Sequence, residues 1–462
     1  MSGQRGVGAH SRREYGTKCT TKAFRLYLPI CVRAVIASFR RTNPGSTATA
    51  TRQLSLVHAA NCDSGRVRRG LRPSESADPR HRKASTIVKF ALKAGVCAAA
   101  TTALVVGAFA PSASAHSTDE WRSRKPFINQ FKKIDVIAST VPANGDVNPY
   151  GVAVVPRSKD KLRKGEVLVS NFNNSDNHQG TGTTIVQISR EGKQSLFAQI
   201  DAKKLPGKCP GGVGLTTALV VLRTGWVIVG SLPTADGSSA TAQAGCLIVL
   251  DSKGQVRETF SGHGINGPWD MTADDDGESV DLFVTNVLNG IVGGQPATTN
   301  QGTVLRLELK IKGDRPPVLR KITTIGSGFT EKTDPTALII GPTGVGLGKD
   351  GTLYVADTAA NRIAAIPDAD DRKTSAGTGR TITQGGHLSG PLGLTIAPNG
   401  NVLTVNGGDG NIVETNPCQK AQVAFRTLVE NGAGALFGLA IAPDNRGVYF
   451  VNDNDNTLEL LH

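Results

Sequence analysis

A short β-hairpin recurs along this chain, and this repeat restricts its fold more than any other feature. Residues 342–363 read PTGVGLGKDGTLYVADTAANRI, in which apolar and small residues alternate before a polar turn at Lys349–Gly351. A second apolar run, Leu353–Val355, leads to Asp357, so the stretch predicts a β-hairpin. One hairpin cannot bury its own apolar face, and it therefore needs neighbours of the same kind.

Five other segments repeat this pattern. The six units align on the residue that opens each first strand: Gly151, Thr217, Asp270, Gly344, Gly393 and Gly438. A second apolar strand ending on a polar residue follows each opening, and the openings lie 45 to 74 residues apart. Six all-β units of this size predict a six-bladed β-propeller.

The two ends of the repeat region predict how the ring closes. The sixth unit stops at His462 with room for about three strands. Upstream of the first unit, residues 133–138 form an apolar run that belongs to no hairpin. We expect this N-terminal strand to complete the last blade, which removes two exposed sheet edges. The propeller then spans residues 130–462.

The fourth unit, GVGLGKDGTLYVADTAANRI, resembles an NHL repeat, and residues 130–462 resemble NHL-type six-bladed propellers. The resemblance is strongest in units four to six and weakest in unit two. It implies the fold and little about activity, because this architecture serves lyases, lactonases, receptor ectodomains and binding scaffolds alike. Function has to be argued from the site.

The segment before the propeller predicts export. Residues 88–115 contain a basic start, an apolar stretch and the small-residue cleavage pattern Ala113-Ser114-Ala115, as in a secretory signal peptide. Residues 1–87 have no sustained apolar period, and we expect a disordered leader, or one that is not translated if synthesis starts near Val88. Residues 116–129 are expected to be a linker, and the mature protein to be periplasmic or extracellular.

The charge of the chain is concentrated before the cleavage site. Residues 1–115 hold 19 Lys and Arg against 4 Asp and Glu, which leaves 33 of the 52 basic and 34 of the 38 acidic residues for the rest. A nearly neutral mature protein offers no electrostatic basis for binding nucleic acid or an anionic membrane. No other segment is apolar for long enough to span a bilayer, and we expect a monomer.

Three cysteines follow the cleavage site. In an exported protein the simplest expectation is a structural disulfide. Cys209 precedes the second unit and Cys246 opens that unit's third strand, so these two could meet. Cys418 is expected to be buried in the fifth unit.

Long loops favour one face of the propeller as the site. The connections between second and third strands are long in units one to three, at 171–182, 231–245 and 286–302, and short in units four to six. Functional residues concentrate on such loops, although neutral drift in length is an equal alternative. The partner expected at this face is a small molecule, a glycan or a protein.

Three histidines belong to loops of the same face. His263 and His387 precede the openings of units three and five by similar distances, and His178 lies in the first long loop. Three histidines around a propeller mouth could hold zinc with an open coordination position, as in NHL-type amidating lyases, with Tyr150 as a nearby base. The alternative is that they are ordinary loop residues, since no H-x-H or H-E-x-x-H spacing is present.

Polar residues recur where the second strands end, which suggests a ring around the channel. Such a ring mostly caps strand ends and binds a ligand only where several groups converge. Calcium is a further alternative at 453–456, although the spacing of a known calcium loop is missing. The candidate ligand-binding residues are Tyr150, Asn171, His178, His263, Trp269, Asn286, Asp357, Arg362, His387, Asn406 and Asp453.

The sequence carries no signature of a particular reaction. The first unit has Asn148-Pro149-Tyr150-Gly151 where senescence-marker-type gluconolactonases begin with a metal-binding Glu. No G-x-S-x-G motif or phosphate-binding glycine loop is present. The sequence therefore predicts a binding propeller, with a metal-dependent lyase or hydrolase using the histidines as the alternative.

Overall fold

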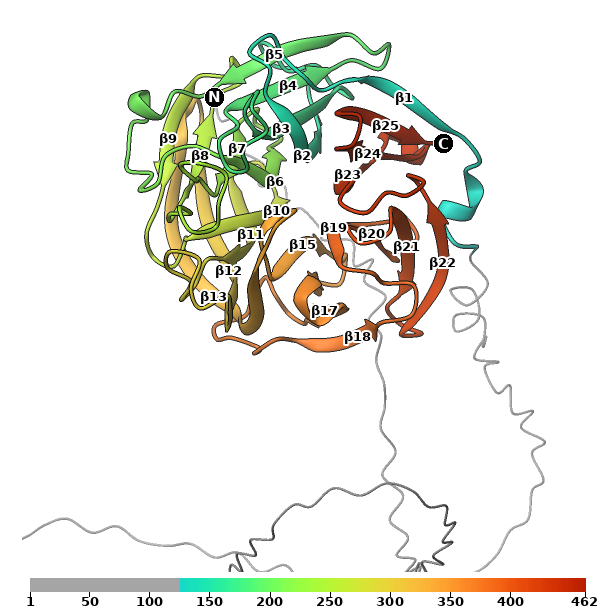
Figure 1. Cartoon of the computed structure of the whole chain (residues 1–462). Coiled ribbons are helices and arrows are strands. Elements are labelled where there is room, and N and C mark those ends of the chain that lie inside the picture. Colours follow the sequence, from blue (N-terminus) through green and yellow to red (C-terminus); the bar gives the residue numbers. More distant parts are fainter. Residues whose placement is uncertain (1–124) are drawn as a thin grey trace, which may run out of the picture. The chain divides into compact units, whose positions relative to one another are not determined.

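The computed structural model describes residues 125–462; the predicted leader and signal peptide lie outside this range. Within it the strands form six antiparallel sheets arranged as blades around a central channel (Figure 1). The first strand of each unit is the innermost, because β2, β6, β10, β15, β19 and β23 contact one another around the ring. The prediction of an all-β six-bladed propeller is confirmed.

The strands follow the predicted hairpins. Blade 1 contains β2 (Val147–Val154), β3 (Val167–Asn173), β4 (Thr184–Ile188) and β5 (Gln194–Gln199). Blade 2 contains β6 (Leu215–Val221), β7 (Val227–Ser231), β8 (Cys246–Leu250) and β9 (Val256–Phe260). Blade 4 contains β15 (Pro342–Leu347), β16 (Leu353–Asp357), β17 (Arg362–Ile366) and β18 (Arg380–Gln384). Blade 5 contains β19 (Pro391–Ile396), β20 (Val402–Asn406), β21 (Asn411–Asn416) and β22 (Ala421–Thr427).

Blade 3 departs from the four-strand pattern. It contains β10 (Gly267–Asp275), β11 (Ser279–Val287), β12 (Thr298–Lys312), β13 (Arg315–Asp334) and β14 (Leu338–Ile340). The hairpin β12–β13 is much longer than its counterparts, and its return strand ends in a turn to β14. Through Lys332–Ile340 and Asp334–Leu338 pairing, β14 extends this sheet by a fifth strand.

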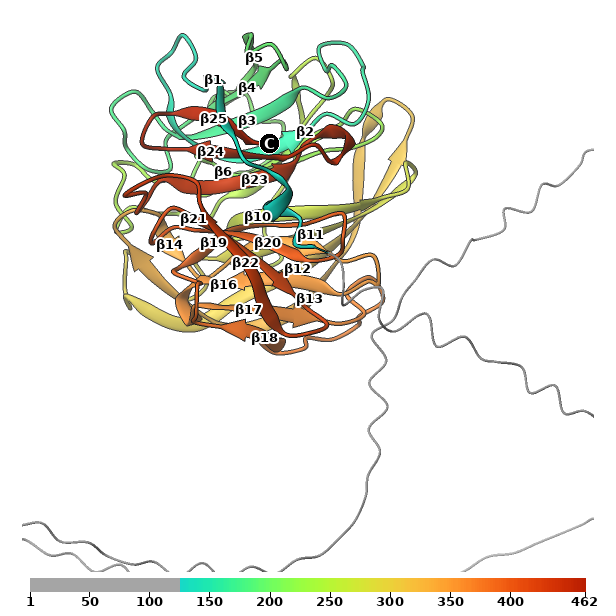
Figure 2. The same cartoon turned by 90° about the vertical axis from the view of Figure 1, so that its right-hand side faces the viewer.

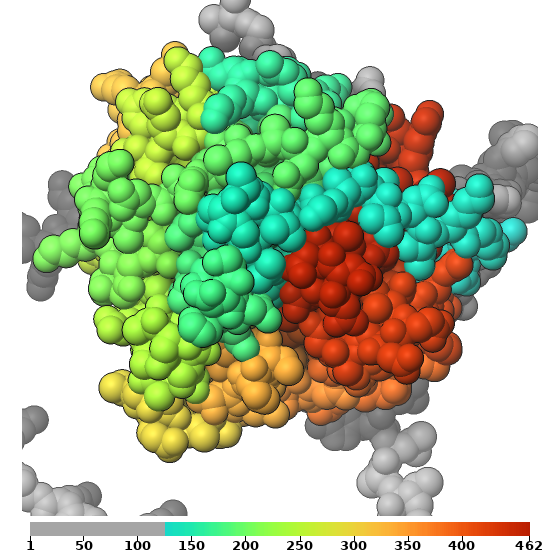
Figure 3. Space-filling view, turned by 45° about the horizontal axis from the view of Figure 1, so that its top comes forward, coloured from blue at the N-terminus to red at the C-terminus, as the bar shows by residue number. Residues whose placement is uncertain are grey.

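The ring closes as the sequence predicted. Blade 6 contains β23 (Leu436–Ile441), β24 (Val448–Asn452), β25 (Thr457–Leu461) and the N-terminal β1 (Ile134–Ser139). Strand β1 pairs antiparallel with β25, from Ile134 opposite Leu461 to Ser139 opposite Thr457. Figure 2 shows the two strands side by side, and Figure 3 shows the N-terminal strand across the red last blade.

The segment before β1 also belongs to the folded domain. The 3-10 helix η1 (Ile128–Gln130) packs on blade 5, although the sequence placed residues up to 129 in a linker. Glu414 explains the docking, because its carboxylate accepts hydrogen bonds from the backbone N–H groups of Phe127 (2.8 Å) and Ile128 (2.9 Å). The other 3-10 helices are η2 (Ala202–Lys204), η3 (Thr358–Ala360) and η4 (Pro443–Asn445).

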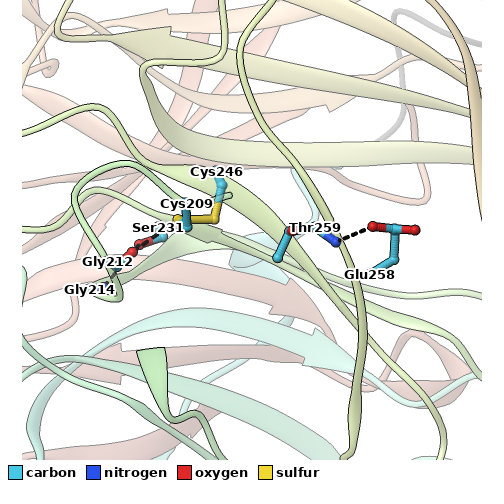
Figure 4. Close-up of a disulfide and its surroundings, with 7 residues drawn as sticks. All are labelled: Cys209, Gly212, Gly214, Ser231, Cys246, Glu258 and Thr259. Atoms are coloured by element: carbon cyan, nitrogen blue, oxygen red, sulfur yellow. Dashed lines mark hydrogen bonds between the residues drawn. A yellow bond between two sulfur atoms is a disulfide. The ribbon is translucent and has the colours of Figure 1, made fainter. Parts of the chain in front are cut away.

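A disulfide anchors the loop that enters blade 2. Cys209 and Cys246 are bonded, with their Cα atoms 5.2 Å apart (Figure 4). Nearby, the Ser231 hydroxyl accepts from the Gly214 N–H and donates to the Gly212 carbonyl, each at 3.0 Å. The expected pairing is therefore confirmed. Cys418 is exposed at the turn between β21 and β22 and not buried, because that turn lies at the end of the outer hairpin of blade 5.

None of the helices in residues 125–462 has the length and apolar character needed to cross a lipid bilayer.

Candidate functional site

The inner strands of adjacent blades lie close together at the residues that open the units. A Cβ atom at Gly393 would lie 1.9 Å from the carbonyl oxygen of Phe437, and one at Gly438 would lie 2.1 Å from that of Tyr150. Glycine is needed at these positions because the inner strands of adjacent blades touch there. In blade 2 this position belongs to Ala218 and not to Thr217, because Leu219 pairs with Val229 as Val152 pairs with Val169. We call the ring of Gly151, Ala218, Asp270, Gly344, Gly393 and Gly438 the waist. Asp270 brings the largest side chain to it.

On the long-loop side of the waist, an apolar plug fills the channel. We define the plug as Tyr150, Trp269, Phe437 and residues 338–340 of β14. All of them are buried in one hydrophobic cluster, to which five blades contribute. Residues from five blades can meet only at the centre of the ring. Tyr150 stacks on Phe437 with ring centroids 3.9 Å apart, and the indole N–H of Trp269 donates to the Ile339 carbonyl at 3.1 Å. The funnel expected at this face is therefore closed.

Tyr150 and Trp269 are packed inside the plug and have a structural role there. Tyr150 also stacks on Phe172, with ring centroids 4.4 Å apart, and it is 1% exposed. Burial raises the pKa of the Tyr150 hydroxyl well above its ordinary value, since the phenolate would lose its hydration. A general base needs a pKa near or below the working pH. The surroundings of Tyr150 thus oppose the catalytic role that the sequence suggested.

On the other side of the waist, where the first hairpins turn, the channel opens as a cavity of about 490 Å³. All six inner strands contribute to its wall. Each inner strand pairs on one side only, so the backbone groups of its other edge face the channel. Many side chains of the wall are apolar, among them Val152, Leu347, Ile396 and Ala440, but polar atoms make up the larger part of its exposed surface. A ligand there would meet both apolar side chains and hydrogen-bonding groups.

Asp270 lies where this cavity meets the waist. Its carboxylate accepts hydrogen bonds from the backbone N–H groups of Met271 (2.8 Å) and Val345 (3.2 Å), so it joins blade 3 to blade 4. The side chain is 8% exposed, and burial raises the pKa of the Asp270 carboxyl to about 8, because water solvates the charged form far better than this site does. Asp270 is therefore mostly protonated at neutral pH.

The polar ring predicted at the ends of the second strands exists and caps strands. Asn171 donates to the carbonyl of Thr140 at 3.1 Å, Asn286 accepts from the backbone of Asn266 at 2.9 Å, and Asn406 donates to the carbonyl of His387 at 2.7 Å. Asp357 and Arg362 form a buried ion pair at 2.7 Å within blade 4. These groups bind loops of their own blades and do not converge on a common point.

In the sixth blade the position predicted for Asp453 belongs to its neighbour. Strand β24 ends at Asn452, which pairs with Leu436 as Asn406 pairs with Pro391. Asn452 donates to Glu459 at 2.8 Å. Asp453 follows in the turn, and burial raises the pKa of its carboxyl to about 7. The one-residue shift arises because Asn and Asp alternate from 452 to 456, and sequence alone does not show which of them ends the strand.

The three histidines lie in different surroundings and do not form a common metal site. The ring of His387 stacks on Phe425 of the outer strand β22, with centroids 3.7 Å apart. His178 is exposed beside Gly237 of blade 2, and His263 is exposed in the connection between β9 and β10. Among residues 125–462, no group of three His, Cys, Asp or Glu side chains is placed to hold a metal ion. Neither zinc nor calcium finds a ligand set there.

Sequence reasoning missed Asp270, Thr217 and the plug strand β14. A signal was present for Asp270. Four of the six aligned openings are Gly, so a carboxylate in that column marks a place where the ring accommodates a side chain. The alignment put Thr217 in the same column, where the strand pairing puts Ala218. The plug strand had no such signal, because Leu338–Ile340 read like an ordinary continuation into blade 4.

Comparison with known proteins adds distant similarities. No family model matches the sequence, and a search of curated proteins gives no match. Among solved structures, a gluconolactonase from Xanthomonas campestris is 13% identical, with a TM-score of 0.45 and coverage of 70% of this chain and 87% of that one. The calcium-binding protein regucalcin from Agrobacterium tumefaciens is 14% identical (TM-score 0.46; 71% and 93%), and a streptogramin B lyase is 15% identical (TM-score 0.42; 71% and 97%). Similarities at this level carry no information about activity.

Proposed function

We propose that this protein binds a small organic molecule in the open end of its channel, on the face where the first hairpins turn. The observation that carries the proposal is the cavity of about 490 Å³, to whose wall apolar side chains, backbone polar groups and, at the inner end, Asp270 contribute. Closure of the opposite end by the plug favours this face over the one with the long loops. The resemblance to NHL-type propellers fits a binding role.

Binding accounts for the cavity better than catalysis does. Beyond Asp270, the ionisable residues that line it are Arg223, Asp274 and Asp275, and these belong to the rim at the turn of blade 3 and the end of β6. General acid–base chemistry needs a second group near the first. The inner end of the cavity has one carboxyl and no nucleophile paired with a base.

Blocking the cavity tests the proposal. Ala440 lines the wall and is half-buried, and a phenyl group there would occupy the cavity. We expect ligand-observed NMR with the full chain to find fragments that bind the wild type and not Ala440→Phe. Ala235→Phe, an exposed position in a long loop, is the matched control and should leave binding unchanged. Fragments lost with Ala235→Phe and kept with Ala440→Phe would place the site at the other face.

We also propose that the protein is exported. The Cys209–Cys246 disulfide supports this, because disulfides persist in oxidising compartments. Intact-mass measurement of the protein recovered outside the cytoplasm should give a chain that begins after Ala115. A recovered chain that retains residues 1–87 would contradict the predicted signal peptide.

A further inference from the structure

The inner end of the cavity holds an acid without a counter-charge. None of the ion pairs in residues 125–462 includes Asp270, whose partners are two backbone N–H groups. Natural proteins rarely bury a carboxyl without pairing it unless it has a role, because desolvation of the charged form is costly. A ligand that brings a positive charge would remove this cost.

A hydroxyl group in the lining of the same cavity has no partner. Thr217 precedes the waist residue Ala218 in blade 2 and lines the cavity. It is 4% exposed, and within the described part of the chain its hydroxyl oxygen has no hydrogen-bond partner. Buried hydroxyl groups are nearly always bonded, and a buried hydroxyl without a protein partner beside a cavity can bond a ligand there.

The rim adds negative charge. The lining there includes two carboxylates, Asp274 and Asp275, and one guanidinium, Arg223, while β2, β15, β19 and β23 contribute no ionisable residue to it. The backbone N–H of Arg223 donates to Asp275 at 2.6 Å, which fixes that carboxylate at the mouth. A cation therefore gains at the entrance as well as at the inner end of the cavity.

From these observations we infer that the ligand is an organic cation with a protonated amine, whose ammonium group donates hydrogen bonds to the Asp270 carboxylate and the Thr217 hydroxyl. The inference rests on the proposed binding function. A metal ion fits less well, since no group of three ligating side chains stands in residues 125–462. The apolar side chains of the wall suit the carbon skeleton of an amine.

Binding of this kind changes the protonation of Asp270. The free carboxyl is mostly protonated at pH 7, because burial raises its pKa to about 8. An ammonium ion stabilises the charged form, so the carboxyl O–H loses its proton to the solvent as the ligand R–NH₃⁺ enters. The balance is one cation bound for about one proton released, and affinity rises with pH up to about 8.

Isothermal titration calorimetry of the full chain with hexylammonium and with 1-hexanol tests the inference. Titrations at pH 7 in two buffers of different ionisation enthalpy count the protons released. We expect hexylammonium to bind at least about tenfold more tightly than hexanol and to release about one proton. Asp270→Asn should remove the preference and the release, whereas the rim variant Asp274→Asn should keep the release.

The outcomes separate the two proposals. Equal affinity for both probes without proton release would overturn the cation inference and leave the binding site in place. Failure of both probes to bind, together with failure of the fragment screen, would overturn the binding site as well. Calcium chloride should cause no proton release; release with calcium would identify a metal ion as the occupant. The wild-type proton count decides the inference even if Asp270→Asn fails to fold.

Discussion

The two ends of the central channel differ: buried side chains fill one end, and the other end is an open cavity. Before the waist the inner strands carry Tyr150, Trp269 and Phe437, which fill the space together with β14. One or two residues after the waist the same strands carry Val152, Thr272 and Ala440, and the channel opens. Side-chain size on either side of a ring of glycines therefore decides which end receives a ligand.

The difference between the two ends of the channel also changes the interpretation of the long loops. They occur on the closed face, where Gln179 of the first long loop donates to the carbonyl of Pro335 beside the plug at 2.6 Å. The longest excursion of blade 3 supplies the plug strand itself. In this propeller, the extra loop length covers and fills one end of the channel, and the short turns leave the other end open.

Truncation of the plug should have the largest effect. Tyr150→Ala removes a buried ring between Phe172 and Phe437 and should lower the free energy of unfolding by roughly 3–5 kcal/mol, as large-to-small core changes do. Val152→Ala, two residues along the same strand on the open side, should cost about 1 kcal/mol. Urea unfolding of the two variants measures both values. Similar small losses would mean that the long-loop end is not packed.

Both ends should make stability fall as pH rises, through different residues. Asp270 at the open end and Glu331 beside the plug strand are buried acids, and burial raises the pKa of each carboxyl to about 8. The folded state keeps these protons from about pH 4 to about pH 8 while the unfolded state loses them, so the folded state is progressively destabilised across that window.

Substituting each acid in turn separates the contribution of Asp270 to this pH dependence from that of Glu331. Asp270→Asn and Glu331→Gln should each flatten the decline between pH 5 and 8 by on the order of 2 kcal/mol. Hexylammonium should reduce the part due to Asp270 alone, because the ligand reaches only the open end. Urea unfolding at several pH values measures these slopes. A decline that neither substitution alters would assign the pH dependence to other groups.

The histidines on the long-loop face should matter least. His387→Ala loses a stacking contact with the half-exposed ring of Phe425 and should cost at most about 1 kcal/mol. His178→Ala and His263→Ala change exposed side chains and should stay within about 0.5 kcal/mol. Thermal unfolding with and without added zinc checks this expectation. A zinc-dependent stabilisation lost in these variants would restore the metal hypothesis.

The repeat explains why so much of the fold was predictable. Hairpin turns and alternating apolar residues recur in all six units, so each unit supports the interpretation of the others, and the orphan strand at 134–138 had one place left to pair. The site was harder. Whether Tyr150 or Trp269 lines a funnel or packs in a plug depends on residues 338–340, which lie 69 or more positions away in sequence. Pattern reasoning has no access to such contacts.

Asp270 is the opposite case. The sequence contained a signal for it, but only the structure shows what the signal means. A carboxylate in a column of glycines can be an outward-facing turn residue or a buried acid at the waist. Only the close approach of adjacent inner strands, which places Val345 of blade 4 within hydrogen-bond distance, distinguishes the two.

The central claim is that the channel is open where the first hairpins turn and closed on the long-loop side. Thiol labelling of two cysteine variants, one on each side of the waist, tests this claim most directly. Thr395 lines the open cavity, and Thr343 is buried on the plugged side. In the full chain, Thr395→Cys should react with a trimethylammonium-ethyl methanethiosulfonate several times faster than with its anionic sulfonate analogue, and Thr343→Cys should stay unreactive. Protection of Thr395→Cys together with labelling of Thr343→Cys would contradict the account, because the open end would then lie on the long-loop face.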